Sequence, residues 1–168
     1  MSFETSQGDF VVQVNRAWSP KGADRFYALV NEGYFTDVRF FRVIPGFVAQ
    51  FGMHGDPATN EKWDSRTITD DPVRETNARG TLVFATSGPN TRGNQFFINF
   101  VDNTRLDGMG FSPFGRVVEG MSVVDSIHGG YGDGPGAPQQ DRIAREGNAY
   151  LKREFPNLDY IEKATIIR

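Results

Sequence analysis

The chain has 168 residues, no cysteine, and a net charge of −3 at pH 7. Its length predicts a single domain, residues 1–168, with a core large enough to fold without a metal or a disulfide. The lack of cysteine excludes disulfides, thiolate catalysis and iron–sulfur clusters, and the slight acidic excess argues against nucleic-acid or membrane-surface binding. No apolar run could cross a bilayer, and the first ten residues lack a secretory signal, so we expect a cytoplasmic protein. We also expect a monomer.

A hairpin and a helix are predicted at the start of the chain. Residues 3–5 and 10–14 indicate two strands joined by a turn, because apolar residues alternate along the second of them. Ser19 is placed to cap a helix whose first position is Pro20, and Gly33 is placed to end that helix.

Two strands and a long polar stretch follow. Residues 38–44 and 47–51 are typical of strands, and Pro45-Gly46 between them is typical of a turn. Residues 52–79 show no clear periodicity and are predicted to form loops, with one short strand near 66–69. The acidic side chains of these loops are expected to be solvated: Glu61, Asp64, Asp70 and Asp71.

The rest of the chain completes a mainly β pattern. Fifteen Phe and 19 Gly favour short strands joined by tight turns over a helical bundle. Strands are predicted over 81–86, 94–100, 114–118 and 159–167, helices over 121–128 and 139–155, and a glycine-rich connector over 131–138. Ile143, Tyr150 and Leu151 lie on the apolar side of the second helix. Together these elements predict a closed, eight-stranded antiparallel β-barrel with flanking helices.

The sequence contains none of the usual catalytic or metal-binding motifs. His54 and His128 match no metal-ligand or nucleophile spacing, so both are expected to be loop histidines. No phosphate-binding, dinucleotide-binding or nucleophile-elbow motif is present. We therefore expect neither a metal nor a cofactor.

One aromatic side chain is predicted on an unusual face of a strand. Alternation within residues 95–100 places Phe96, Ile98 and Phe100 on a core face and leaves Phe97 on the opposite, polar face. Phe97 is then either covered by a loop or helix, or part of a recognition surface.

An arginine is predicted among bulky apolar residues. Arg42 shares a face with Phe40 and Ile44 if residues 38–44 form one strand. A charge in such surroundings needs a partner or a path to water. Taken alone, Arg42 fits a structural arginine. Taken with Gln50, Gln95 and Phe97, it fits the one charged donor of an apolar groove.

Three blocks of the sequence resemble the signature of the cyclophilins. The first is FRVIPGFVAQ over residues 41–50, and the second is SGPNTRGNQFFI over residues 87–98. The third joins Leu106-Asp107-Gly108 to Phe114-Gly115-Arg116-Val117, and the order and spacing of the blocks resemble the family too. The segment over residues 131–157 resembles an insertion seen in some bacterial-type members.

The resemblance implies a peptidyl-prolyl cis–trans isomerase that assists protein folding without a cofactor. Its partners would be proline-containing peptides and unfolded protein chains. Arg42 matches the family's catalytic arginine, and Gln50 matches the glutamine that holds the substrate carbonyl and orients the arginine. The backbone segment that pairs with substrate is matched by Ala85 and Thr86. The other matched substrate-binding positions are Phe47, Val48, Gln95, Phe97, Leu106, Phe111 and Phe114.

This chain departs from the family pattern around the pocket. Arg105 stands where cyclosporin-sensitive members carry tryptophan, so cyclosporin binding is expected to be weak. Phe111 is expected to take the place of a histidine found near the pocket in many members. Val48 replaces a more usual methionine, which is expected to make the pocket shallower.

Two other functions fit parts of the sequence. A proline-binding scaffold or chaperone with little turnover would use the same groove. A barrel that binds a small ligand in its interior, as lipocalins do, would need space that core faces rich in Phe and Val leave scarce.

Overall fold

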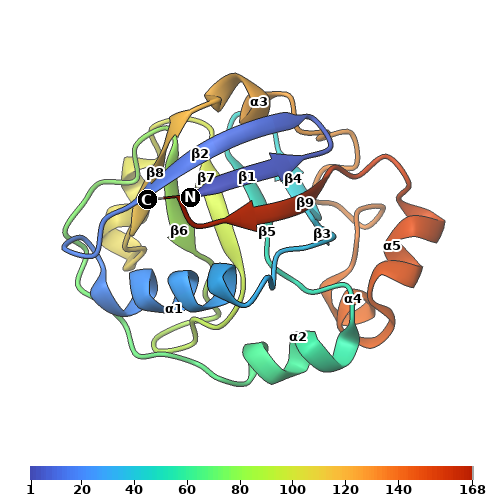
Figure 1. Ribbon diagram of the computed structural model, residues 1–168, viewed down its shortest axis with the longest axis horizontal. Coiled ribbons are helices and arrows are strands. Elements are labelled where there is room, and N and C mark those ends of the chain that lie inside the picture. Colours follow the sequence, from blue (N-terminus) through green and yellow to red (C-terminus); the bar gives the residue numbers. More distant parts are fainter. Residues whose placement is uncertain (168) are drawn as a thin grey trace.

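The protein is mainly β. The computed structural model describes residues 1–167 and contains one nine-stranded antiparallel sheet that curls strongly on itself (Figure 1). The strands follow one another across the sheet in the order β3-β9-β1-β2-β8-β6-β7-β5-β4. Their bounds are β1 (Ser2–Thr5), β2 (Gly8–Val14), β3 (Val38–Arg39), β4 (Arg42–Ile44), β5 (Val48–Phe51), β6 (Thr81–Phe84), β7 (Phe96–Asn99), β8 (Gly115–Glu119) and β9 (Tyr160–Thr165).

Short helices surround the sheet. They are α1 (Pro20–Asn31), α2 (Pro57–Asp64), the 3-10 helix η1 (Thr104–Met109), α3 (Met121–Asp125), α4 (Gln140–Glu146) and α5 (Asn148–Glu154). Helices α1 and α3 lie at opposite ends of the curled sheet, while α2, α4 and α5 gather on one side of it (Figure 1). Among residues 1–167, no helix combines the length and the apolar character that crossing a membrane requires.

The predicted closed barrel of eight strands is wrong in strand number and in closure. Residues 38–44 form two strands, β3 and β4, which are the two edges of the sheet and pair with β9 and β5 respectively. The break falls at two consecutive phenylalanines. Phe40 packs into the main core, whereas Phe41 packs into a second apolar cluster on the other side of the chain. The core face therefore resumes at Val43. Arg42 does not share a face with Phe40, contrary to the prediction.

Phenylalanine rings fill the space inside the sheet. Phe26 from α1 lies 5.0 Å, centroid to centroid, from both Phe96 and Phe114. Phe84 lies 4.5 Å from Phe96. All four side chains are essentially inaccessible to water, as close packing of large rings requires. These rings occupy the interior space in which the lipocalin-like alternative would place a ligand.

The N-terminus of α1 is capped from a distant loop. Ser19 makes no side-chain capping bond to α1, contrary to the prediction. Its hydroxyl instead donates to the Asp71 carboxylate, which also accepts the backbone N–H groups of Lys21 and Gly22. Arg92 completes this arrangement with an ion pair to Asp71 at 3.0 Å. Asp71 is buried, so the prediction that it is solvated is wrong, whereas the predicted end of the helix at Gly33 is confirmed.

Two helical regions differ from the sequence-based prediction. Helix α2 lies within residues 52–79, where loops were predicted, and near 66–69 only Ile68 makes a bridge, to Arg92. The single helix predicted over 139–155 is divided into α4 and α5 at Gly147. Gly147 has a φ of 63°, and a Cβ there would lie 2.0 Å from the Gly55 carbonyl oxygen, so only glycine fits this junction.

Candidate active site

A cavity of about 320 Å³ opens on the outer face of β5, β6 and β7. Backbone alternation explains why apolar side chains lie there, since Phe97 points outward between the core residues Phe96 and Ile98. A separate apolar cluster forms the wall of the cavity, and its buried members are Val48, Val83, Phe97 and Leu106. Phe47, Ala85 and Phe111 pack against this cluster and are partly exposed.

Phe97 is nearly buried and is also one of the residues that line the cavity. The residue is only 5% exposed, and the Phe111 ring meets the Phe97 ring edge-on with 5.6 Å between ring centroids. Leu106 on η1 belongs to the same buried apolar cluster as Phe97. Neighbouring residues therefore cover Phe97, as one alternative predicted, and Phe97 also lines the cavity, whereas its part in a recognition surface stays a prediction.

Hydrogen bonds to Asp107 hold η1 in place. The Asp107 carboxylate accepts bonds from the backbone and side-chain N–H groups of Asn77 at 2.8 and 2.7 Å, and from the Thr76 hydroxyl. Burial alone would raise the pKa of Asp107, but these hydrogen bonds outweigh burial and lower it. A charged, fully bonded Asp107 therefore fixes the turn that carries Leu106 and Phe111.

Arg42 lies at the rim of the cavity, and hydrogen bonds to Gln50 and Asp133 fix two edges of its guanidinium group. Its Nη1 donates to the Gln50 Oε1 at 2.8 Å, which β4–β5 pairing makes possible by placing Arg42 opposite Gln50. Its Nε and Nη2 donate to the two carboxylate oxygens of Asp133 at 2.7 and 3.1 Å. The Arg42 side chain is 31% exposed. The hydrogen bonds from Arg42 lower the pKa of Asp133, so the pair is charged on both sides.

Three glutamine side chains form a chain of hydrogen bonds that begins next to Arg42. The Gln50 Nε2 donates to the Gln95 Oε1 at 2.9 Å, and the Gln95 Nε2 donates to the Gln140 Oε1 at 3.3 Å. These three side chains also line a polar hollow of about 130 Å³, to which Thr86 and Asp64 contribute. A cavity with an aromatic wall, two arginines (Arg42 and Arg105) among its lining residues and a polar hollow beside it can accept a peptide with an apolar ring and an extended flanking chain.

The structure brings together most of the predicted site residues. Those that line the apolar cavity are Arg42, Phe47, Val48, Gln50, Ala85, Thr86, Phe97, Leu106 and Phe111. Gln95 lines the adjoining hollow. Phe114 does not belong to the site. It is fully buried in the main core, where its ring, directly before β8, packs against Phe26 and Phe84.

Some site residues were missed by the sequence analysis. Met109 and Gln140 line the cavity, and Asp133 pairs with Arg42. Asp133 and Gln140 belong to a glycine-rich connector and a polar helix, and no local pattern there points to partners 91 and 45 residues earlier in the chain. Only the position of Met109, between the matched Leu106 and Phe111, could have suggested its role.

Neither histidine lies in the cavity. The Nδ1 of His54 accepts the Asp56 backbone N–H, and burial lowers the pKa of His54. His128 packs edge-on against Tyr131. Over residues 1–167, no three His, Asp or Glu side chains are grouped so that they could hold a metal ion.

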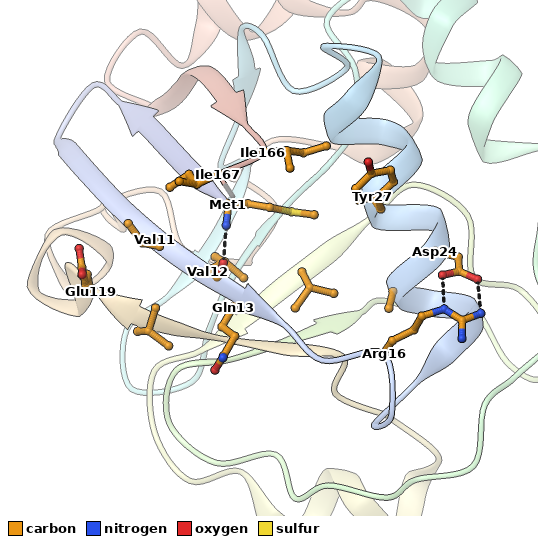
Figure 2. A pocket seen from close by; sticks show the side chains of 13 residues that line it. Met1, Val11, Val12, Gln13, Arg16, Asp24, Tyr27, Glu119, Ile166 and Ile167 are labelled. Atoms are coloured by element: carbon orange, nitrogen blue, oxygen red, sulfur yellow. Dashed lines mark hydrogen bonds and ion pairs between the residues drawn. The ribbon is translucent and has the colours of Figure 1, made fainter.

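A second and larger hollow lies elsewhere on the molecule. It has a volume of about 780 Å³ and is bordered by Met1, Val12, Tyr27 and Ile167, with an exposed ion pair between Arg16 and Asp24 (Figure 2). The N-terminal ammonium donates to the Val12 carbonyl oxygen inside it. No residue of the predicted site lines this hollow, so it is separate from the cavity beside Arg42.

Sequence comparisons identify the family. A family model described as cyclophilin type peptidyl-prolyl cis-trans isomerase/CLD matches residues 1–148. The peptidyl-prolyl cis-trans isomerase-like 1 of Emericella nidulans is 37% identical over 133 residues, which cover 76% of this chain and 80% of that protein. The peptidyl-prolyl cis-trans isomerase B of Escherichia coli K12 is 35% identical over 143 residues, which cover 77% and 84%.

The fold comparison agrees with the sequence comparisons. The crystal structure of a cyclophilin type peptidyl-prolyl cis-trans isomerase from Cryptosporidium parvum, determined in the presence of the dipeptide Ala-Pro, superposes with a TM-score of 0.73 at 23% identity. The match covers 99% of this chain and 98% of that one. The chain belongs to the cyclophilin-type peptidyl-prolyl cis–trans isomerases, enzymes that rotate the peptide bond preceding proline.

Proposed function

We propose that the cavity beside Arg42 binds the proline ring of an X-Pro segment and that Arg42 is the catalytic residue. The single observation that carries this assignment is a guanidinium fixed at the rim of an apolar cavity walled by Phe97 and Phe111. The ring would lie against the aromatic wall. The chain on its amino side would follow Ala85 and Thr86 toward the polar hollow.

Prolyl rotation requires no covalent chemistry from this site, only stabilisation of a twisted amide. No covalent bond breaks, and the barrier of about 20 kcal/mol reflects the loss of amide resonance. Raising a spontaneous rate of about 0.01–0.1 per second by four to five decades requires about 5.5–7 kcal/mol. An apolar cavity favours the twisted amide, which has lost its charge separation, over the planar and more polar ground state.

Arg42 would act on the twisted amide alone. The prolyl nitrogen gains a lone pair as planarity is lost, and an N–H of Arg42 can donate to that lone pair but finds no acceptor there in the planar state. Interactions restricted to the transition state raise kcat. Charge-assisted donation at a partly dry site contributes about 2–4 kcal/mol, judged from losses of oxyanion donors. Fixing the ring against Phe97 would supply much of the remainder.

The substrates we propose are X-Pro segments in flexible or unfolded protein chains. The crystal structure of the Cryptosporidium parvum protein was determined in the presence of the dipeptide Ala-Pro, which supports a site for short proline peptides here. A cytoplasmic location, a monomeric state, a single domain over residues 1–168 and the bacterial type of the 131–157 segment stay predictions. The compared relatives come from fungi as well as bacteria.

An exchange measurement on the unmodified protein tests the proposed function. We expect a substoichiometric amount of protein to accelerate cis–trans exchange in a short Ala-Pro peptide, followed by NMR exchange spectroscopy. Heat-denatured protein serves as the control. Peptide binding without faster exchange would contradict the proposal and favour the alternative of a proline-binding scaffold.

Replacing Arg105 with tryptophan should strengthen cyclosporin binding. Arg105 is exposed on η1 and stacks over the Phe47 ring at 5.2 Å, at the position where the resemblance places tryptophan in sensitive family members. An aromatic anchor at a binding surface is typically worth about 2 kcal/mol, so we expect Arg105→Trp to lower the cyclosporin Kd by about tenfold or more. Isothermal titration calorimetry measures the change. Arg116→Trp, at an exposed arginine on β8, is the control, and equal affinities for the two variants would contradict the prediction.

A further inference from the structure

The segment that follows α3 reaches back to the proposed catalytic residue. Asp133 binds the Nε and Nη2 edge of Arg42 with both carboxylate oxygens, while Gln50 binds Nη1. A guanidinium bound in this way on two edges cannot rotate about its long axis. Five N–H donors are available and these bonds use three, so two N–H groups remain for a substrate.

The same segment also provides Gln140, the last member of the chain of hydrogen-bonded amides that begins at Gln50. Arginine can only donate hydrogen bonds, so the Oε1 of Gln50 must accept, and the Nε2 of Gln50 is left to donate to Gln95. The Nε2 of Gln95 is in turn left to donate to Gln140. The chain of bonds therefore begins at Asp133 and ends at Gln140, and both residues belong to the segment over 131–157. The orientation of every amide between them follows from the donor-only character of Arg42.

An apolar cluster anchors this segment beside Arg42. Phe41, the residue directly before Arg42, is 2% exposed and packs with Ile143, Tyr150 and Leu151 of α4 and α5. Asn148 at the start of α5 adds hydrogen bonds to the backbone carbonyl and the carboxylate of Asp37. The segment therefore contacts the chain around Arg42 through the apolar side chains of α4 and α5 and through Asp133 of its glycine-rich connector.

We propose that the 131–157 segment is the positioning element of the active site and that Asp133 is the positioning residue for Arg42. The inference rests on the proposed catalytic role of Arg42. Arg42 donates to the prolyl nitrogen only during rotation. Loss of its fixed orientation therefore destabilises the transition state, whereas binding of the ground-state substrate to the cavity wall is unchanged. Asp133 is therefore a determinant of kcat and not of KM.

Removing the Asp133 carboxylate tests the proposal. We expect Asp133→Ala to lower kcat for an Ala-Pro peptide about five- to tenfold with KM changed less than about twofold. Asp133→Glu, which can restore a carboxylate partner for Arg42, should recover part of the loss. Asp141→Ala, which removes an exposed carboxylate from the same segment, is the matched control and should leave kcat unchanged. An Asp133→Ala variant as fast as the unmodified protein, or faster, would overturn the proposal.

A double-mutant cycle separates this proposal from the proposed function. Asp133→Ala in an Arg42→Ala background should have no further effect on kcat, because Asp133 acts through Arg42. Equal losses in both backgrounds would mean that Asp133 serves another role and would refute the positioning proposal. If Arg42→Ala alone leaves the rate unchanged, the proposed function fails instead. The ¹⁵Nε–¹H signal of Arg42 gives a readout independent of turnover, and we expect it to exchange faster with water in Asp133→Ala than in Asp141→Ala.

Discussion

Arg42→Ala is expected to lower kcat/KM for an Ala-Pro peptide by about 100- to 1,000-fold, the range seen when a transition-state donor is removed. Arg42→Lys should recover little of this loss, because an ammonium lacks the planar fork that Gln50 and Asp133 bind together. The fold should survive both changes, since the Arg42 side chain is partly exposed and its carboxylate partner is 51% exposed. Exchange kinetics measure kcat/KM for each variant, and a thermal melt measures its stability.

Arg16→Ala is the matched control for this experiment. Arg16 also makes a bidentate ion pair, to Asp24 at 2.7 and 2.8 Å, but it borders the separate hollow of Figure 2. Its replacement should leave the isomerase rate unchanged. Equal rates for Arg16→Ala and Arg42→Ala would refute the role assigned to Arg42.

Asp71→Ala is expected to destabilise the protein by about 3–5 kcal/mol, the usual consequence of removing one partner from a buried ion pair. Asp71 and Arg92 are both almost completely buried, so the variant would leave an uncompensated guanidinium inside the protein. It would also remove the acceptor for two backbone N–H groups at the start of α1. Asp70→Ala, at the exposed neighbouring residue, should cost less than about 1 kcal/mol. Urea denaturation compares the two, and similar losses would contradict the role given to Asp71.

The same carboxylate should make stability depend on acid pH. Burial alone would raise the pKa of Asp71, but hydrogen bonds from Ser19, Gly22 and Arg92 outweigh burial and lower it. A carboxyl whose pKa is lower in the folded state stabilises the protein above the unfolded-state value of about 3.9, and this contribution disappears as the pH falls through the folded-state pKa. Unfolding free energy should therefore be level from neutral pH to about pH 5 and decline below about pH 4. The unfolding free energy of the Asp71→Asn variant should decline less steeply over that pH range.

Side-chain alternation predicted the parts of the site that lie within one strand. The pattern from Phe96 to Phe100 correctly separated the core face from Phe97, because backbone pleating alone fixes which side chain points inward. Arg42 and Gln50 were singled out by the family resemblance, and the structure shows that β4–β5 pairing places them opposite each other.

Features that depend on distant partners could not be predicted. Phe40 and Phe41 are both buried because residues 143–158 supply a second apolar cluster, and nothing near the phenylalanines reveals it. In the same way, an aspartate in a polar loop becomes the cap of α1 in one case and the partner of Arg42 in the other. Asp71 and Asp133 have local sequences that resemble ordinary solvated loops, so long-range contacts alone determine their roles.

The pairing of β1 with β9 has a consequence for biosynthesis. β1 is made first, yet its position in the sheet lies between β2 and β9, and β3 likewise pairs with β9. While the nascent chain is still attached to the ribosome, one edge of β1 has no neighbour, and an unpaired edge invites wrong partners. An enzyme that accelerates proline rotation in other polypeptides therefore cannot complete its own sheet during translation until residues 160–165 have emerged from the exit tunnel.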